Sequence, residues 1–255
     1  MKIVIYDNAE QVAEQAANII CQTIKNKPKT VLGLATGRTP LKTYQHLIEK
    51  NKQGSVDFSQ VSTFNLDEYL GVKPCSENGY RFYMDEHLFK HININLENTA
   101  VPCSDLDKIN QTCLEYEQQI KLCGGIDLQL LGLGSNGHVG FNEPSSSFAS
   151  RTRVVALAAS TLSDNSELLT GEPQTFDKAI SMGIATILDS KEIVIIALGK
   201  AKAQAVASAI EGALSASCPA SCLQMHANVT WLLDQEASSL LTQKRYYQLS
   251  QKLLA

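Results

Sequence analysis

The sequence of 255 residues is notable first for what it lacks. It has no apolar run near the roughly 20 residues that a membrane-spanning helix needs, and its first residues are too poor in apolar side chains for a signal peptide. It also has no basic run or basic helix face, and its net charge is -4, so nothing favours nucleic acid as a partner. Small anionic ligands remain possible because they need only a local site.

The cysteines form no Cys-x-x-Cys pair, and their number is odd, so neither a disulfide framework nor a zinc site is indicated. Free thiols suit a reducing compartment, and we therefore expect a cytoplasmic protein. The seven cysteines are at positions 21, 75, 103, 113, 123, 218 and 222.

Several catalytic signatures are missing as well. No His/Cys/Asp cluster has metal-ligand spacing, so we expect no metal, and no Gly-x-Ser-x-Gly elbow indicates a serine hydrolase. The letters Gly132-x-Gly134-x-x-Gly137 match a dinucleotide fingerprint, but His138 and Pro144 follow closely and no acidic strand end lies at the usual distance. A nucleotide cofactor is therefore not indicated.

What is present is a regular alternation of apolar strands and amphipathic helices, without linker, composition break or internal repeat. This predicts an α/β fold, a doubly wound, Rossmann-like and mostly parallel sheet with helices on both faces, in a single domain over 1–255. We expect strands at 3–6, 31–35, 61–66, 127–133, 154–158, 193–199 and 229–234. Helices are expected after Asn8, Pro40 and Lys200 and at 80–89, 107–122 and 236–254. Residues 160–177 suit a mobile surface segment.

Four of the strand ends collect polar or charged residues. In a parallel sheet the carboxyl ends of the strands share one edge, where ligands bind, so these four groups should meet in space. They are Thr36 to Thr39, Asp67 with Glu68, Ser135 to Glu143, and Lys200 with Lys202.

Each group has a chemical and a plain structural interpretation. The segment Thr36-Gly37-Arg38-Thr39-Pro40 offers hydroxyls, a guanidinium and backbone N–H groups for an anion, or it is an ordinary strand-to-helix turn. Asp67 follows a buried run, where desolvation would raise its pKa and make it a base; alternatively it is a helix cap or turn aspartate. Glu68 is interpreted as a solvated or supporting neighbour.

The third group combines a histidine with a carboxylate after a glycine-rich turn. Histidine changes its charge near neutral pH, and a carboxylate five residues away can hold its tautomer. His138 and Glu143 are therefore candidates for acid–base chemistry. The remaining histidines, at 46, 87, 91 and 226, have no comparable neighbours and are interpreted as structural.

Taken together, these motifs resemble those of the glucosamine-6-phosphate deaminase family, in its shorter form, over nearly the whole chain. The matching segments are Leu34-Ala35-Thr36-Gly37-x-Thr39-Pro40, Asn65-Leu66-Asp67-Glu68-Tyr69, Leu131-Gly132-x-Gly134-x-Asn136-Gly137-His138-x-Gly140-Phe141-Asn142-Glu143-Pro144, Ser150-Arg151-Thr152 and Pro219-Ala220-Ser221. The resemblance implies conversion of glucosamine 6-phosphate and water to fructose 6-phosphate and ammonia, without a cofactor.

The resemblance also implies a role for each matched residue. His138 would open the sugar ring, with Glu143 and Asn136 orienting and tuning it. Asp67 would move a proton from C2 to C1, an aldose–ketose step that needs one carboxylate base. The phosphate would be held by the backbone from Thr36 to Thr39 and by Lys202, and residues 157–180 would form a lid.

Three residues depart from the family pattern. Asn136 stands where the long form has aspartate and short forms have asparagine, Arg38 where the family has a small residue, and Glu167 where the lid has a phosphate-binding arginine. We hypothesise that Arg38 replaces that guanidinium; alternatively Glu167 points to solvent, or the substrate is galactosamine 6-phosphate. Allosteric activation should be weak or absent, because Ser146 and Arg153 match the long form's allosteric site whereas Val155 replaces a lysine.

Two other interpretations share the fold. A 6-phosphogluconolactonase lacks the carboxylate of Phe141-Asn142-Glu143-Pro144, and a sugar-phosphate-sensing regulator would need a DNA-binding segment before the first strand, which begins at residue 3. The deaminase interpretation is therefore preferred, with a small amino-sugar phosphate as partner. Monomer and homo-oligomer both stay open, as does the gluco or galacto epimer.

Overall fold

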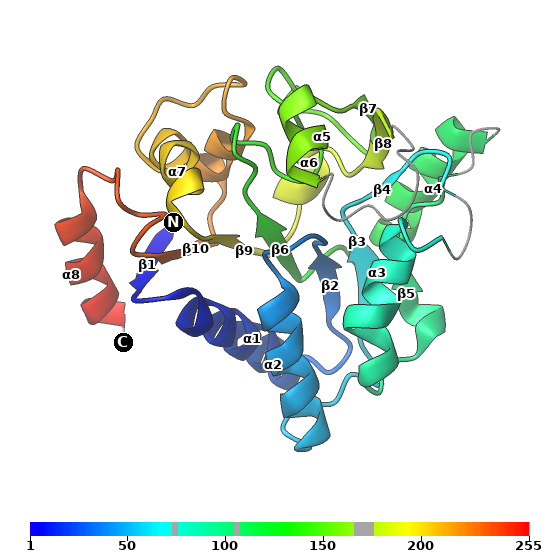
Figure 1. Ribbon diagram of the computed structural model, residues 1–255. Helices are drawn as coiled ribbons and strands as arrows, with labels where there is room; N and C mark the ends of the chain where they lie inside the picture. The colour runs from blue at the N-terminus through cyan, green and yellow to red at the C-terminus, as the bar shows by residue number, and fades with distance from the viewer. Residues whose placement is uncertain (73–75, 105–107, 166–175, 255) are drawn as a thin grey trace.

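The computed structural model describes residues 1–72, 76–104, 108–165 and 176–254. Within these ranges a seven-stranded sheet runs through the molecule, and all its neighbouring strands pair in parallel. Its order is β1 (Lys2–Tyr6), β10 (Val229–Asp234), β9 (Glu192–Ala197), β6 (Leu128–Gly132), β2 (Val31–Leu34), β3 (Ser62–Asn65) and β5 (Thr99–Ala100). This confirms the predicted α/β class (Figure 1).

Helices cover both faces of the sheet, because the central strands are apolar on both sides. On β9 the side chains of Val194 and Ile196 pack into a core with α1 (Ala9–Asn26) and α2 (Leu41–Lys52). The alternate side chains of Ile193 and Ile195 pack into a second core. This second core takes residues from α4 (Ile109–Leu122), α6 (Ile184–Leu188), α7 (Ala203–Ile210) and the 3-10 helix η6 (Pro219–Met225). Figure 1 shows α1 and α2 below the sheet and α7 and α6 above it.

The prediction missed a second sheet. In the described part of the chain, three short antiparallel strands form it: β4 (Asp67–Tyr69), β8 (Lys178–Ser181) and β7 (Arg153–Ala156). The expected strand at 154–158 thus belongs to this sheet and not to the main one. The chain leaves β3, passes Leu66 and enters β4 at once, so Asp67 lies between the two sheets, paired with Ser181 of β8.

The first and the last helix each begin at a side chain that accepts backbone N–H groups. The predicted Asn8 cap is confirmed, since its side chain accepts the N–H of Gln11 at 3.0 Å. The last helix, expected from residue 236, begins only at α8 (Lys244–Leu254). Its start is fixed by Glu211, whose carboxylate accepts the N–H groups of Thr242 and Gln243 at 2.8 and 2.9 Å.

The remaining elements lie close to their predicted positions. The helix expected at 80–89 is α3 (Tyr80–His87) followed by the 3-10 turn η1 (Phe89–His91), and the irregular 92–106 contains η2 (Leu96–Asn98) and the edge strand β5. The predicted lid, 157–180, contains α5 (Ala159–Asn165) and most of β8, and Glu167 lies outside the described residues. The 3-10 turn η5 (Lys200–Lys202) precedes α7.

Candidate active site

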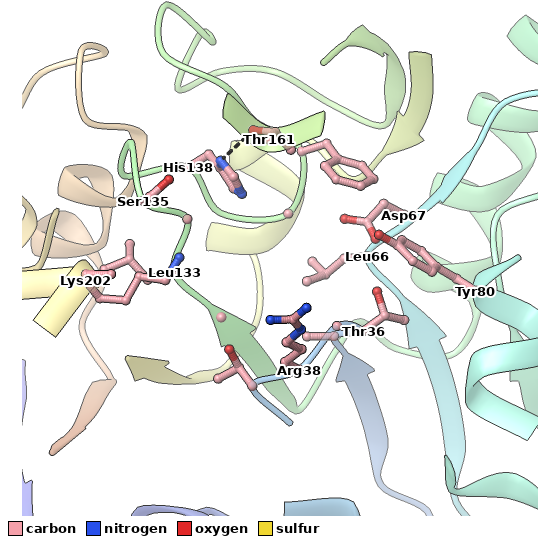
Figure 2. Close-up of a pocket in the computed structure, with 18 of the residues that line it drawn as sticks. Thr36, Arg38, Leu66, Asp67, Tyr80, Leu133, Ser135, His138, Thr161 and Lys202 are labelled. Carbon is pink, nitrogen blue, oxygen red and sulfur yellow. Dashed lines mark hydrogen bonds between the residues drawn. The ribbon is translucent and has the colours of Figure 1, made fainter. Parts of the chain in front are cut away.

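A cavity of about 520 Å³ lies at the carboxyl edge of the main sheet. Its lining takes residues from all four polar strand ends: Thr36 to Thr39, Asp67, Ser135 with His138, and Lys202. The predicted meeting of these groups is confirmed, although Glu68, Glu143 and Lys200 are not in the lining. In Figure 2 His138 and Asp67 stand on two sides of the cavity, and Arg38 extends into it from the β2 exit loop.

The β2 exit loop is held to α3 and α2 by tyrosine hydroxyls. The hydroxyl of Tyr83 donates to the carbonyl oxygen of Gly37 at 2.5 Å, and that of Tyr44 donates to the carbonyl oxygen of Ala35. The loop leads directly into α2. Arg38 is exposed, and the other residues from Thr36 to Thr39 are half-buried. The cationic side chains of Arg38 and Lys202 line the same cavity. This wall can bind an anion.

Asp67 lies on a wall made of aromatic rings. Tyr69 contacts Tyr80, Phe141 and Phe176, with ring centroids 5.0, 5.5 and 5.2 Å apart, and Asp67 is 6% exposed. Burial, together with the neighbouring charge of Glu68, raises the pKa of Asp67 from 3.8 to about 8. A carboxylate in such a place is a strong base near neutral pH once it is ionised.

Glu68 is buried, so the expectation of a solvated side chain was wrong and that of a supporting neighbour is confirmed. Its carboxylate accepts the N–H groups of Tyr69, Tyr80 and Arg81 at 2.8 to 3.2 Å, and thereby caps the start of α3. Burial raises its pKa to about 7, against the lowering effect of these N–H groups. Glu68 thus ties α3 to β4 and adds negative charge beside Asp67.

His138 lies on the turn after β6. Its ring Nδ1 is 2.8 Å from Oδ1 of Asn136 and 3.5 Å from Oε2 of Glu143. The same Oδ1 also accepts the backbone N–H of His138 at 3.2 Å, which fixes the orientation of the Asn136 amide. Since Nδ1 faces oxygen acceptors, the proton of the neutral ring belongs on Nδ1, and Nε2 can accept a proton on the cavity side (Figure 2).

Glu143 stands behind His138 and is held ionised. Burial alone would raise its pKa, but hydrogen bonds from His138, Thr161 and Asn136 lower it to about 2. Asn136 donates to Oε2 at 2.7 Å, and Thr161 donates to Oε1 at 2.5 Å. Glu143 can therefore orient the imidazole and stabilise its cationic form without itself reaching the cavity.

One turn connects the two titratable parts of the site. His138 lies on this turn, and two residues later a Cβ built on Gly140 would lie 3.4 Å from Oδ2 of Asp67. Gly140 also has φ of 55°, a left-handed conformation that glycine adopts readily. Glycine therefore lets the turn approach the carboxylate.

Sequence reasoning missed some of the lining residues. Tyr80, whose side chain hydrogen-bonds those of Tyr69 and Thr36, gave no local signal beyond its place at a helix start. Thr161 and Ser163 come from α5, in a segment interpreted only as a lid. Recognising them would have required knowing where α5 lies.

The residues that match the dinucleotide fingerprint do not adopt the strand-to-helix structure of that motif. A turn that carries His138, and not a helix, follows Gly132. Among the described residues, no group of three or more His, Cys, Asp or Glu side chains could hold a metal ion. Nor does the described part of the chain contain a helix with the length and apolarity that crossing a membrane requires.

Comparison with known proteins agrees with this geometry. The family described as glucosamine-6-phosphate isomerases/6-phosphogluconolactonase matches residues 6–231. A glucosamine-6-phosphate deaminase of Shewanella woodyi is 49% identical over 259 residues, which cover 100% of this chain and 98% of that protein. The chain belongs to the glucosamine-6-phosphate deaminase family.

A further relative and two solved structures are also similar to this chain. A glucosamine-6-phosphate deaminase of Thermoanaerobacter pseudethanolicus is 46% identical over 94% of this chain and 95% of that protein. The solved structure of a monomeric glucosamine-6-phosphate deaminase superposes with a TM-score of 0.92 at 43% identity, covering 94% of this chain and all of that one. A 6-phosphogluconolactonase of Thermotoga maritima has a TM-score of 0.71 at 20% identity over 92% of this chain and 99% of that one, which shows a shared fold.

Proposed function

We propose that this protein converts glucosamine 6-phosphate and water to fructose 6-phosphate and ammonia, a deaminating aldose–ketose isomerisation. The observation that carries the proposal is the pairing, in one cavity, of a buried carboxylate at Asp67 with His138 backed by an ionised Glu143. An anion-binding wall completes the site. The reaction needs these three parts and no cofactor.

The first step opens the sugar ring. Nε2 of His138 takes the proton of the anomeric hydroxyl. The imidazolium then gives a proton to the ring oxygen of the sugar as the bond between C1 and that oxygen breaks. Glu143 stabilises the imidazolium that exists between these transfers, and Asn136 holds the ring orientation. The product is the open-chain aldehyde.

The second step moves the proton between carbons. Ionised Asp67 removes the C2 proton, and the electron pair forms a C1–C2 double bond as the aldehyde oxygen takes a proton from the ammonium group that the substrate carries on C2. The carboxyl proton then goes to C1, which leaves an iminium group at C2 and the carboxylate ionised again. Water adds to this iminium carbon and the nitrogen departs as ammonium, giving the ketose. One carboxylate acts as base and then as acid, so its pKa near neutrality suits both roles.

The phosphate group of the substrate is assigned to Lys202 and to the loop from Thr36 to Thr39, in which Arg38 supplies the charge. We expect Arg38→Ala to raise KM for glucosamine 6-phosphate about 10- to 100-fold with kcat within about threefold, since it removes a charge-assisted contact made equally in ground and transition states. Arg245→Ala, on exposed α8, is the matched control. Unchanged KM in Arg38→Ala would refute the assignment.

The function itself is tested by incubating the protein with glucosamine 6-phosphate and measuring ammonia and fructose 6-phosphate. Asp67→Asn is the negative control, with an expected loss of at least about 10²-fold in kcat. Parallel reactions with galactosamine 6-phosphate and 6-phosphogluconolactone decide the epimer and the lactonase alternative. Absence of ammonia from both amino sugars would refute the proposal.

The setting proposed for this reaction is the cytoplasm, with a small amino-sugar phosphate as the partner and neither nucleic acid nor membrane. The exposed free thiols of Cys103 and Cys123 support a reducing compartment. The proposal includes a lid formed by residues 157–180. Helix α5 lies in this segment and contributes Thr161 and Ser163 to the cavity lining.

A further inference from the structure

Thr161 occupies the space between the two parts of the ring-opening pair. It is 1% exposed, and its Oγ1 lies 2.5 Å from Oε1 of Glu143 and 3.4 Å from Nδ1 of His138. The backbone N–H of Ala158, directly before α5, donates to the same Oε1 at 3.1 Å. Helix α5 and the residue directly before it thus supply the two donors that hold this carboxylate oxygen.

Counting hydrogens fixes the direction of these contacts. A threonine hydroxyl has one hydrogen, and the ionised Glu143 can only accept, so the hydrogen of Thr161 points to Oε1. The hydroxyl therefore presents a lone pair to His138. Nδ1 then faces Oγ1 of Thr161, Oδ1 of Asn136 and Oε2 of Glu143, all of them acceptors.

The consequence is a ring with one allowed neutral tautomer. Three acceptors around Nδ1 leave the proton there, and Nε2 carries the lone pair toward the cavity. Threonine also suits this position because its branched Cβ restricts χ1, so Oγ1 is held between Oε1 of Glu143 and Nδ1 of His138.

We propose that Thr161 is a positioning residue for ring opening, whose hydroxyl donates to Glu143 and accepts from His138, and so fixes the tautomer and orientation of the imidazole. The proposal rests on the function given above, since the residue acts through His138 on that reaction. Without the hydroxyl, Oε1 of Glu143 keeps only the Ala158 N–H, and both the carboxylate and the ring gain freedom to turn.

The kinetic experiment compares Thr161→Val, which keeps the shape, with Thr161→Ser, which keeps the hydroxyl. Ser160→Ala, on the exposed side of the same helix, is the control. We expect kcat to fall about 10- to 100-fold in Thr161→Val, with KM within about twofold, and to stay within about threefold of wild type in Thr161→Ser and Ser160→Ala. Affinity for the reduced, open-chain amino-sugar alcohol 6-phosphate should not change in any variant.

Three results would overturn the proposal: wild-type kcat in Thr161→Val, equal loss in the valine and serine variants, or a matching loss of affinity for the open-chain alcohol. Wild-type protein that releases no ammonia would instead refute the function. Nitrogen-15 NMR of the imidazole of wild-type protein gives a readout that needs neither turnover nor a variant. Neutral His138 should carry its proton on Nδ1, and a proton on Nε2 would refute the geometry on which the proposal depends.

Discussion

Asp67 is predicted to lower the stability of the folded protein at the pH where it works. Burial and Glu68 raise its pKa from 3.8 to about 8, so between these values the folded protein holds a proton that the unfolded chain has released. The folded state binds more protons than the unfolded state, and stability therefore falls as pH rises from about 4 to about 8. Asp67→Asn removes the titrating group and should relieve this loss.

The size of the effect follows from the pKa difference. A difference of about four pH units, at about 1.4 kcal/mol per unit, sets an upper limit of about 5 to 6 kcal/mol above pH 8. Water in the cavity can solvate the carboxylate, so we expect Asp67→Asn to be more stable than wild type by about 2 to 3 kcal/mol at pH 8. That corresponds to a rise in Tm of about 5 °C or more for a chain of this size.

The assay is thermal unfolding of both proteins at intervals between pH 4 and pH 9. The gain in Tm should vanish near pH 4, grow with pH and level off above about pH 8, while activity is lost at every pH. Glu14→Gln, an exposed carboxylate on α1, is the control for net charge. An Asp67→Asn variant whose Tm differs from wild type by the same amount at pH 4 and pH 8 would refute the reasoning.

The acid limb of kcat/KM should lie near pH 8, since only ionised Asp67 removes the C2 proton, and Glu68→Gln should move it about one unit lower by removing the neighbouring charge. A limb at the same pH in both proteins would rule out Glu68 as a cause. Gly137→Ala should destabilise the protein by about 1 to 3 kcal/mol more than Gly124→Ala in urea unfolding. Both glycines have φ near 85°, but an added Cβ lies 2.7 Å from Sγ of Cys218 at Gly137 and meets nothing within 4 Å at Gly124, so equal costs would contradict the contact.

The main sheet was predictable because its strands are apolar on both faces, as β9 and β10 show. The three-residue strand β4 was not, since it follows β3 after one residue and its partner β8 lies more than 100 residues away in sequence. Such pairings are decided by tertiary contacts that no local pattern records. The two-residue edge strand β5 is too short to give a signal.

The candidate site divides in the same way. The residues that stand at strand ends, such as Asp67 and His138, could be placed from the alternation of strands and helices alone, because parallel strands bring their ends to one edge. Glu143, which acts from behind His138, could be named because it follows five residues later in the same segment, but Glu68 and Thr161 could not. Glu68 looks like a surface residue in the sequence, and its burial follows from capping α3, whose position only the packed structure reveals.

The fold shifts the pKa values of two carboxyl groups, Asp67 and Glu143, in opposite directions, and this separation supports their different roles. Asp67 lies beside Tyr80 in the lining of the cavity (Figure 2), and burial raises its pKa to about 8. Glu143 is also partly buried, but three side-chain donors lower its pKa to about 2. A group that must take a proton and return it needs a pKa near the working pH, whereas a group that stabilises an imidazolium must stay ionised throughout. Exchanging these environments would remove both functions, so the aromatic wall and the donors around Glu143 belong to the mechanism as much as the two carboxylates do.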